Sequence, residues 1–225
     1  TWAHSIPSRE LNAWPGYRSA AIPADSNAPI MIDEILVPAL ANKAAYLKDL
    51  IELCAIPSVS AQPDRARDVQ YCSQWLSEHL RDIGLKADAM ETGGNPVVFA
   101  EWKHPDPTRP AVLIYGHYDV QPADQNEGWT SEAFKPAIRD GYLYARGASD
   151  NKGQFLAHVK AVQTWLKAKG SLPVSVKFLI EGEEEIGGPH LGPFIAAHRD
   201  LLACDVAIIG SGISGLSVAH QLRGQ

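Results

Sequence analysis

Three short motifs in this sequence contain side chains that could bind a metal ion and activate water. His117 and Asp119 lie in GHYDVQP, Asp150 lies in GASDNKG, and Glu184 and Glu185 lie in EGEEEIGG. Imidazole nitrogens and carboxylate oxygens together suit zinc, and they also suit cobalt or manganese. We therefore treat the three motifs as candidates for one metal site.

The spacing inside the motifs indicates what the side chains could do. Residues two apart on an extended strand face the same side, so Asp119 lies beside His117 and can accept its other ring proton. Several carboxylates close together would repel each other, and a divalent cation, or a pair of cations sharing Asp150, removes that penalty. A glutamate next to a metal-binding glutamate can then deprotonate a bridging water.

Each motif follows a segment that we predict to be a strand or a hairpin. Residues 111–115 precede the first motif and residues 174–180 precede the third, and both segments are apolar and rich in β-prone residues. Residues 134–145 precede the second motif and are predicted to form a hairpin around Asp140 and Gly141. Because ligands collect at the carboxyl ends of strands in an open α/β sheet, we expect the three motifs to meet there.

The other predicted elements indicate the fold class. Apolar residues at helical spacing predict helices over 43–55, 66–83, 152–168 and 190–203, and two further strands are predicted at 96–102 and 205–209. Strands that alternate with helices are typical of an α/β domain with a mostly parallel sheet flanked by helices.

The chain divides into three predicted parts. Residues 1–31 are interrupted by four prolines and carry no apolar period, so we predict an irregular N-terminal arm. Residues 32–209 form the predicted catalytic domain, and residues 210–225 form a tail that contains a GxGxxG pattern.

Composition argues against two classes of partner and favours one compartment. The formal net charge of −6 and a pI of about 5.7 do not give the positive field that nucleic acid attracts. The sequence has no apolar run long enough to predict a membrane span. Its three cysteines are odd in number and widely spaced, which is typical of reduced thiols, so we predict a cytoplasmic protein.

The three motifs, in this order, resemble those of a dizinc metallopeptidase and amidohydrolase family. The family includes carnosinase-type dipeptidases, acetylornithine deacetylase, succinyl-diaminopimelate desuccinylase and aminoacylases. The similarity covers about residues 33–209, and the form of the glutamate motif looks most like the dipeptidase branch. The resemblance implies metal-dependent hydrolysis of a peptide or N-acyl amide bond. It also implies two divalent metal ions, zinc before cobalt or manganese, and a small peptide or N-acyl amino acid as substrate.

The resemblance also implies a role for each of the five side chains. His117 would bind one metal ion, Asp150 would bridge both, and Glu185 would bind the second. Glu184 would be the general base, and Asp119 would orient His117. The peptide bond that follows Asp150 would be cis.

The resemblance breaks at the end of the chain. The family has a further metal-binding aspartate after the next strand, where this sequence has Gly210 and Ser211. Its members also have a lid or dimerisation domain, through which they are usually homodimeric, and a distal metal-binding histidine. This sequence ends at Gln225 and shows neither. An inactive or truncated, non-catalytic relative is therefore an alternative.

The tail supports a different alternative. Gly210, Gly212 and Gly215 follow a predicted strand and precede an apolar stretch, which resembles the opening of a flavin-binding or other dinucleotide-binding domain. On this interpretation the chain would contain a fragment of a flavin-binding oxidoreductase.

Overall fold

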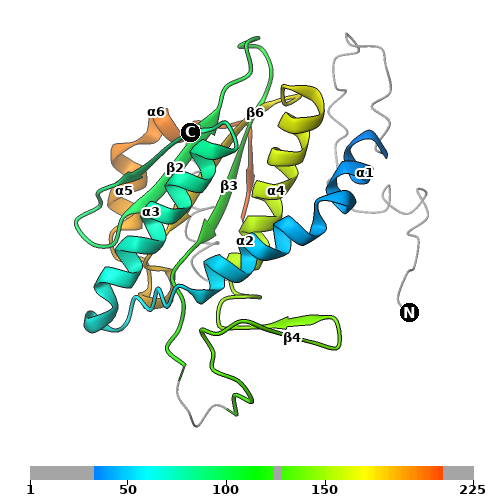
Figure 1. The fold of residues 1–225 in the computed structure, drawn as a ribbon. Helices are drawn as coiled ribbons and strands as arrows, with labels where there is room; N and C mark the ends of the chain where they lie inside the picture. The colour runs from blue at the N-terminus through cyan, green and yellow to red at the C-terminus, as the bar shows by residue number, and fades with distance from the viewer. Residues whose placement is uncertain (1–32, 124–127, 210–225) are drawn as a thin grey trace, which may run out of the picture. The chain divides into compact units, whose positions relative to one another are not determined.

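The computed structural model describes residues 33–123 and 128–209 (Figure 1). The predicted N-terminal arm and the GxGxxG tail, including Ser211, lie outside the described residues. The helices are α1 (Asp33–Ala41), α2 (Lys43–Ala55), α3 (Ala66–Asp82), α4 (Lys152–Lys169), α5 (Leu191–Ala197) and α6 (Arg199–Leu202), with short 3-10 turns η2 (Pro63–Arg65) and η4 (Glu184–Ile186).

A five-stranded sheet forms the centre of the described part. Its strands are β1 (Lys86–Met90), β2 (Val97–Trp102), β3 (Ala111–His117), β6 (Ser175–Glu181) and β7 (Val206–Ile208), in the spatial order β1-β2-β6-β3-β7. Strand β3 pairs in parallel with β6 and β7, and β2 pairs antiparallel with β1 and β6. Only β2 therefore runs against the others in this sheet, which confirms the predicted mostly parallel arrangement.

Helices cover both faces of the sheet. Helices α2, α3 and α4 lie on one face, and α5 and α6 lie on the other (Figure 1). Successive residues of a strand point to opposite faces, and β6 follows this rule. Phe178 and Ile180 pack in the core under α2–α4, whereas Leu179 packs in the core under α5 and α6. Burial on both faces explains why the sequence of β6 is almost continuously apolar.

Several predicted elements are confirmed with small shifts of their ends. Helix α3 buries Val69, Cys72, Leu76 and Leu80, which lie three or four residues apart as the sequence predicted. The predicted hairpin consists of β4 (Ala137–Arg139) and β5 (Tyr142–Tyr144). Asp140 and Gly141 form its two-residue turn with φ values of 51° and 82°, as a type I′ turn requires.

Three features differ from the sequence prediction. The helix predicted over 190–203 is two helices, because the backbone leaves the helical region at His198 (φ −119°, ψ 30°). Helix α1 and strand β1 were not predicted. Strand β1 has the sequence KADAM, in which small alanines give little β signal, and its conformation is set by its pairing with β2.

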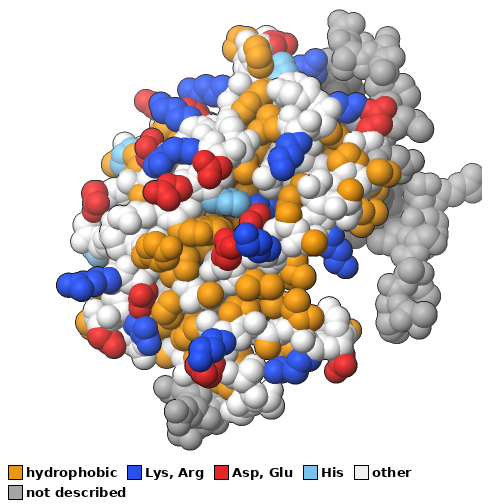
Figure 2. All heavy atoms as spheres, in the orientation of Figure 1, with side chains coloured by type: hydrophobic (Ala, Val, Ile, Leu, Met, Phe, Trp, Pro, Cys, Tyr) orange, Lys and Arg blue, Asp and Glu red, His pale blue; other side chains and the backbone are white. Residues whose placement is uncertain are grey.

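The surface over α2 and α3 mixes residue types. Figure 2 shows hydrophobic side chains gathered there, with acidic and basic side chains around them. Tyr71 on α3 is 55% exposed, and a groove of about 450 Å³ beside it is lined by Trp75, Pro57 and the acidic Glu52 and Asp68. No described helix is long and apolar enough to cross a membrane.

Candidate metal centre

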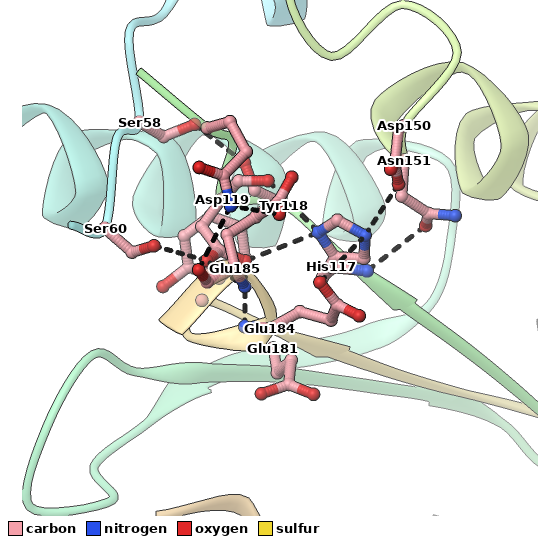
Figure 3. Close-up of polar contacts among 12 residues, drawn as sticks. Ser58, Ser60, His117, Tyr118, Asp119, Asp150, Asn151, Glu181, Glu184 and Glu185 are labelled. Atoms are coloured by element: carbon pink, nitrogen blue, oxygen red, sulfur yellow. Dashed lines mark hydrogen bonds and ion pairs between the residues drawn. The ribbon is translucent and has the colours of Figure 1, made fainter. Parts of the chain in front are cut away.

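The three motifs meet at the carboxyl ends of β3 and β6 (Figure 3). His117 is the last residue of β3 and lies in register with Glu181, the last residue of β6. The loop after β3 brings Asp119 to this edge, and the segment before α4 brings Asp150. The topology therefore gathers side chains that are far apart in the sequence.

His117 presents one ring nitrogen to the other candidate ligands. Its Nδ1 lies 3.1 Å from the carbonyl oxygen of Asp119 and 3.4 Å from that residue's Oδ1. Because a carbonyl oxygen can only accept, Nδ1 carries a hydrogen and donates it. The other nitrogen, Nε2, lies 3.0 Å from Oδ1 of Asp150 and 3.9 Å from Oε2 of Glu184. Nε2 is therefore the nitrogen that a metal ion would use.

Asp119 organises the site more widely than the sequence indicated. Its carboxylate is fully buried and accepts a hydrogen bond from Ser60 Oγ at 2.6 Å. It also accepts backbone N–H bonds from Glu184 at 3.2 Å and from Glu185 at 3.1 Å. Hydrogen bonds to an ionised acceptor are about twice as strong as neutral ones. Asp119 therefore fixes the backbone of the glutamate pair as well as the imidazole of His117.

The glutamate pair lies in η4, which begins three residues after the last residue of β6. Ligand atoms of His117, Glu184 and Glu185 all lie within 4.8 Å of one another. Oε2 of Glu185 accepts a hydrogen bond of 2.8 Å from the side-chain amide of Gln121. One imidazole nitrogen with several carboxylate oxygens is a donor set that fits zinc. The residues present therefore fit the metal that the sequence motifs predicted.

Electrostatics at this edge favours a positive charge. Burial is the largest influence on His117 and opposes its protonation, but the neighbouring carboxylates, led by Asp119, outweigh it and raise the pKa of His117 to about 9. For the carboxyl group of Glu185, burial acts in the other direction and raises the pKa, while the hydrogen bond from Gln121 partly offsets that effect. In the absence of a metal ion the imidazole thus keeps a proton that compensates the surrounding negative charge.

The Asp150 segment has the geometry that the resemblance implied. The Asp150–Asn151 peptide bond is cis, and Oδ1 of Asn151 accepts a hydrogen bond of 3.2 Å from the backbone N–H of His117. The side chain of Asp150 is 75% exposed, so its carboxylate faces solvent at the open side of the site.

Two glutamates of the third motif have contacts that sequence reasoning missed. Glu183 is buried and accepts hydrogen bonds from the backbone N–H of Asn95 at 3.0 Å and from Nδ1 of His190 at 2.8 Å. Glu181 is buried and accepts a hydrogen bond from the hydroxyl of Tyr115, while its Oε2 has no partner among the described residues. Burial raises the pKa of Glu181 to about 7. The run of acidic residues in EGEEE is evident in the sequence, but only the fold shows which of them are buried and which face the site.

Comparison with known proteins places these motifs in a family. Residues 113–218 match the model of the family described as "Peptidase family M20/M25/M40". This match continues beyond residue 209 into the glycines of the tail. Beta-Ala-His dipeptidase of Rattus norvegicus is 37% identical over 168 residues, which are 69% of this chain and 34% of that protein. Cysteinylglycine-S-conjugate dipeptidase of Corynebacterium striatum is 32% identical, over 76% of this chain and 38% of that protein.

Solved structures agree with the sequence comparisons. Human carnosine dipeptidase 1 superposes with a TM-score of 0.76 and 31% identity, over 82% of this chain and 42% of that one. An M20 family metallo-carboxypeptidase from Sulfolobus solfataricus gives a TM-score of 0.67 and 39% identity, over 72% of this chain and 36% of that one. The chain thus spans between 34% and 38% of the two curated dipeptidases named above. Within that span, the described fold is that of an M20 peptidase catalytic domain, and residues 113–218, which contain all three motifs, match the peptidase family M20/M25/M40.

Proposed function

We propose that this protein hydrolyses the peptide bond of small peptides at the carboxyl ends of β3 and β6. The observation that carries the proposal is the convergence of His117 with Glu184 and Glu185, whose ligand atoms lie within 4.8 Å of one another, beside Asp150. The matched relatives support the reaction class, because two of them are named as dipeptidases.

In this proposal the acidic and imidazole side chains have separate roles. His117, Asp150 and Glu185 hold two divalent metal ions, zinc before cobalt or manganese. When bound, such ions polarise the carbonyl group of the substrate and lower the pKa of the attacking water. Asp119 keeps the hydrogen on Nδ1 of His117, so that Nε2 faces the ligands.

Glu184 is the general base of the proposal. Its side chain is 21% exposed, so it is open to a substrate, and its backbone is fixed by the hydrogen bond to Asp119. It takes a proton from the attacking water and returns that proton to the leaving amine. The resulting products are a free carboxylate and a free amine.

The substrate class follows from the relatives, whose names include Beta-Ala-His, cysteinylglycine S-conjugates and succinyl-diaminopimelate. All three contain an amide bond between small polar groups. We propose a dipeptide first and an N-acyl amino acid second, because two of these three relatives are dipeptidases. We also propose a reducing, cytoplasmic location, which the three free cysteines support.

The test compares hydrolysis of β-alanyl-histidine, cysteinylglycine and N-succinyl-diaminopimelate by the zinc-loaded protein and its variants. Glu184→Gln keeps the shape of the side chain but cannot accept the proton, so kcat should fall by about 10²–10⁴-fold. Glu132→Gln is the matched control, because Glu132 pairs with Lys135 on an exposed loop, and its rate should not change.

Equal rates for the wild type and Glu184→Gln would remove Glu184 as the base. Stoichiometric zinc binding without hydrolysis of any of the three substrates would instead support the non-catalytic relative.

A further inference from the structure

The side chain of Lys152 is completely buried. It is the first residue of α4 and lies two positions after Asp150. Its ammonium donates hydrogen bonds to the backbone carbonyls of Leu53 at 3.0 Å and Ile56 at 2.7 Å. These carbonyls lie at the C-terminal end of α2, where the helix dipole is negative. They also accept backbone N–H bonds from Ile56 at 3.3 Å and from Ser58 at 2.9 Å.

Capping α2 does not by itself require a buried charge. Helix ends are ordinarily capped by glycine, by water or by exposed basic side chains. Burying an ammonium ion costs free energy unless neighbouring groups compensate it. The two carbonyls that accept from the ammonium are neutral, so the position of the charge needs a further explanation.

The Lys152 side chain connects the segments that carry the metal ligands. A Cβ at Gly147 would lie 3.2 Å from Cδ of Lys152 and 2.8 Å from Cγ1 of Val120, so Gly147 lies against both the lysine stem and the loop that follows His117. Ser58 lies two residues after Ile56, whose carbonyl accepts a hydrogen bond from the ammonium. Ser58 Oγ donates a hydrogen bond of 2.7 Å to the backbone carbonyl of Tyr118, the residue next to His117 (Figure 3). One buried ammonium thus joins the end of α2 to the His117 loop and to the Asp150 segment.

Its charge also lies close to the negative side of the site. Lys152 and Asp119 act in opposite directions on the pKa of the buried Cys72 thiol, which places both charges within range of the same buried atom. The ammonium and the Asp119 carboxylate therefore both lie near the buried Cys72 thiol.

We propose that Lys152 is a positioning residue of the metal centre, whose buried ammonium holds Asp150 against Nε2 of His117. This inference rests on the proposed function, because it concerns the same metal site. It adds a residue that touches neither metal nor substrate and acts through the backbone of the Asp150 segment.

The test measures the zinc Kd by calorimetry in the full chain, together with the folded fraction by circular dichroism. Lys152→Met keeps the length of the stem and removes the ammonium. The matched control is Lys160→Met, because Lys160 is the other buried lysine of α4, is 6% exposed, and binds Asp49 and His79 away from the site. Both variants should lose stability. Lys152→Met should weaken zinc binding by about 10–100-fold, the usual effect of removing a group that orients a ligand, whereas Lys160→Met should stay within about twofold of the wild type.

A second variant keeps the test decisive if Lys152→Met does not fold. Lys152→Arg retains the charge, but its planar fork cannot bind the two carbonyls as an ammonium does. A folded Lys152→Arg protein should bind zinc at least about fivefold more weakly. Wild-type affinity in the folded Lys152 variants, or equal weakening by Lys160→Met, would overturn the positioning role alone. Absence of zinc binding by the wild type would overturn the metal centre and this role with it.

Discussion

Two clusters in this chain combine a histidine with carboxylates, and their charge balances are opposite. Between α2, α3 and α4, the ammonium of Lys160 lies 2.6 Å from Nε2 of His79 and 2.6 Å from Oδ2 of Asp49. At the edge of the sheet, the imidazole of His117 contacts the carboxylates of Asp119, Asp150 and Glu184. The first cluster contains its own cation, and the second is dominated by acidic groups.

The two histidines respond as this difference requires. Burial, followed by the charge of Lys160, lowers the pKa of His79 below its ordinary value. Nε2 of His79 accepts from the ammonium and the ring stays neutral. Burial also opposes a charge on His117, yet the carboxylates raise its pKa to about 9. The comparison teaches that residue types alone do not mark a metal site. The cluster that needs an external cation is the one whose described contacts leave its negative charge uncompensated.

The largest expected effect comes from removing each histidine in turn. His117→Ala should weaken zinc binding by at least about a thousandfold, because it removes the nitrogen ligand of the set. His79→Ala should leave the zinc Kd within about twofold, although it removes a similar ring. Calorimetric titration of the two folded variants checks this. Similar losses in both would show that the two clusters do not differ in the way proposed.

The second effect is the pH dependence of zinc binding. With a pKa of about 9, His117 is protonated at neutral pH in the metal-free protein, so zinc must displace its proton. The affinity should therefore rise about tenfold per pH unit, or about 100-fold from pH 6 to pH 8, and level off near pH 9.

The stability of the metal-free fold depends on pH in the opposite direction. A pKa raised above that of the unfolded chain stabilises the fold below about pH 6.5, and this stabilisation is lost as the pH rises through about 9. Zinc titrations from pH 6 to 9, with melting of metal-free protein over the same range, measure both trends. A zinc Kd that does not change with pH would contradict the raised pKa of His117.

The sequence predicted the parts of this site that depend on strand ends and on spacing within a motif. The approach of Asp119 to His117 follows from two-residue spacing on extended backbone. The meeting of distant motifs follows from the topology of an α/β sheet. Both inferences need only local patterns, which is why they could be made before the fold was known.

The remaining contacts depend on packing between segments that no sequence period connects. Ser60 bonds Asp119 from the loop after α2, and Lys152 reaches back to the end of that helix. Nothing in a loop serine or in a lysine at the start of a helix distinguishes these positions from exposed ones. Helix α1 was missed for a similar reason, because Pro38 lies inside it and such a residue ordinarily indicates a break.

The smallest expected effect concerns the cluster that needs no metal. Lys160→Met removes the charge that lowers the pKa of His79 but leaves burial, which also lowers it, and Asp49, which raises it. The pKa of His79 should therefore rise toward its ordinary value, and NMR titration of its ring protons measures this. Lys167→Met is the matched control, because Lys167 is an exposed lysine on the same helix, and it should leave the pKa unchanged. An unchanged pKa in Lys160→Met would mean that burial alone keeps His79 neutral. The contrast between the two clusters would then reflect how deeply each histidine is buried rather than the presence of a cation inside the first cluster.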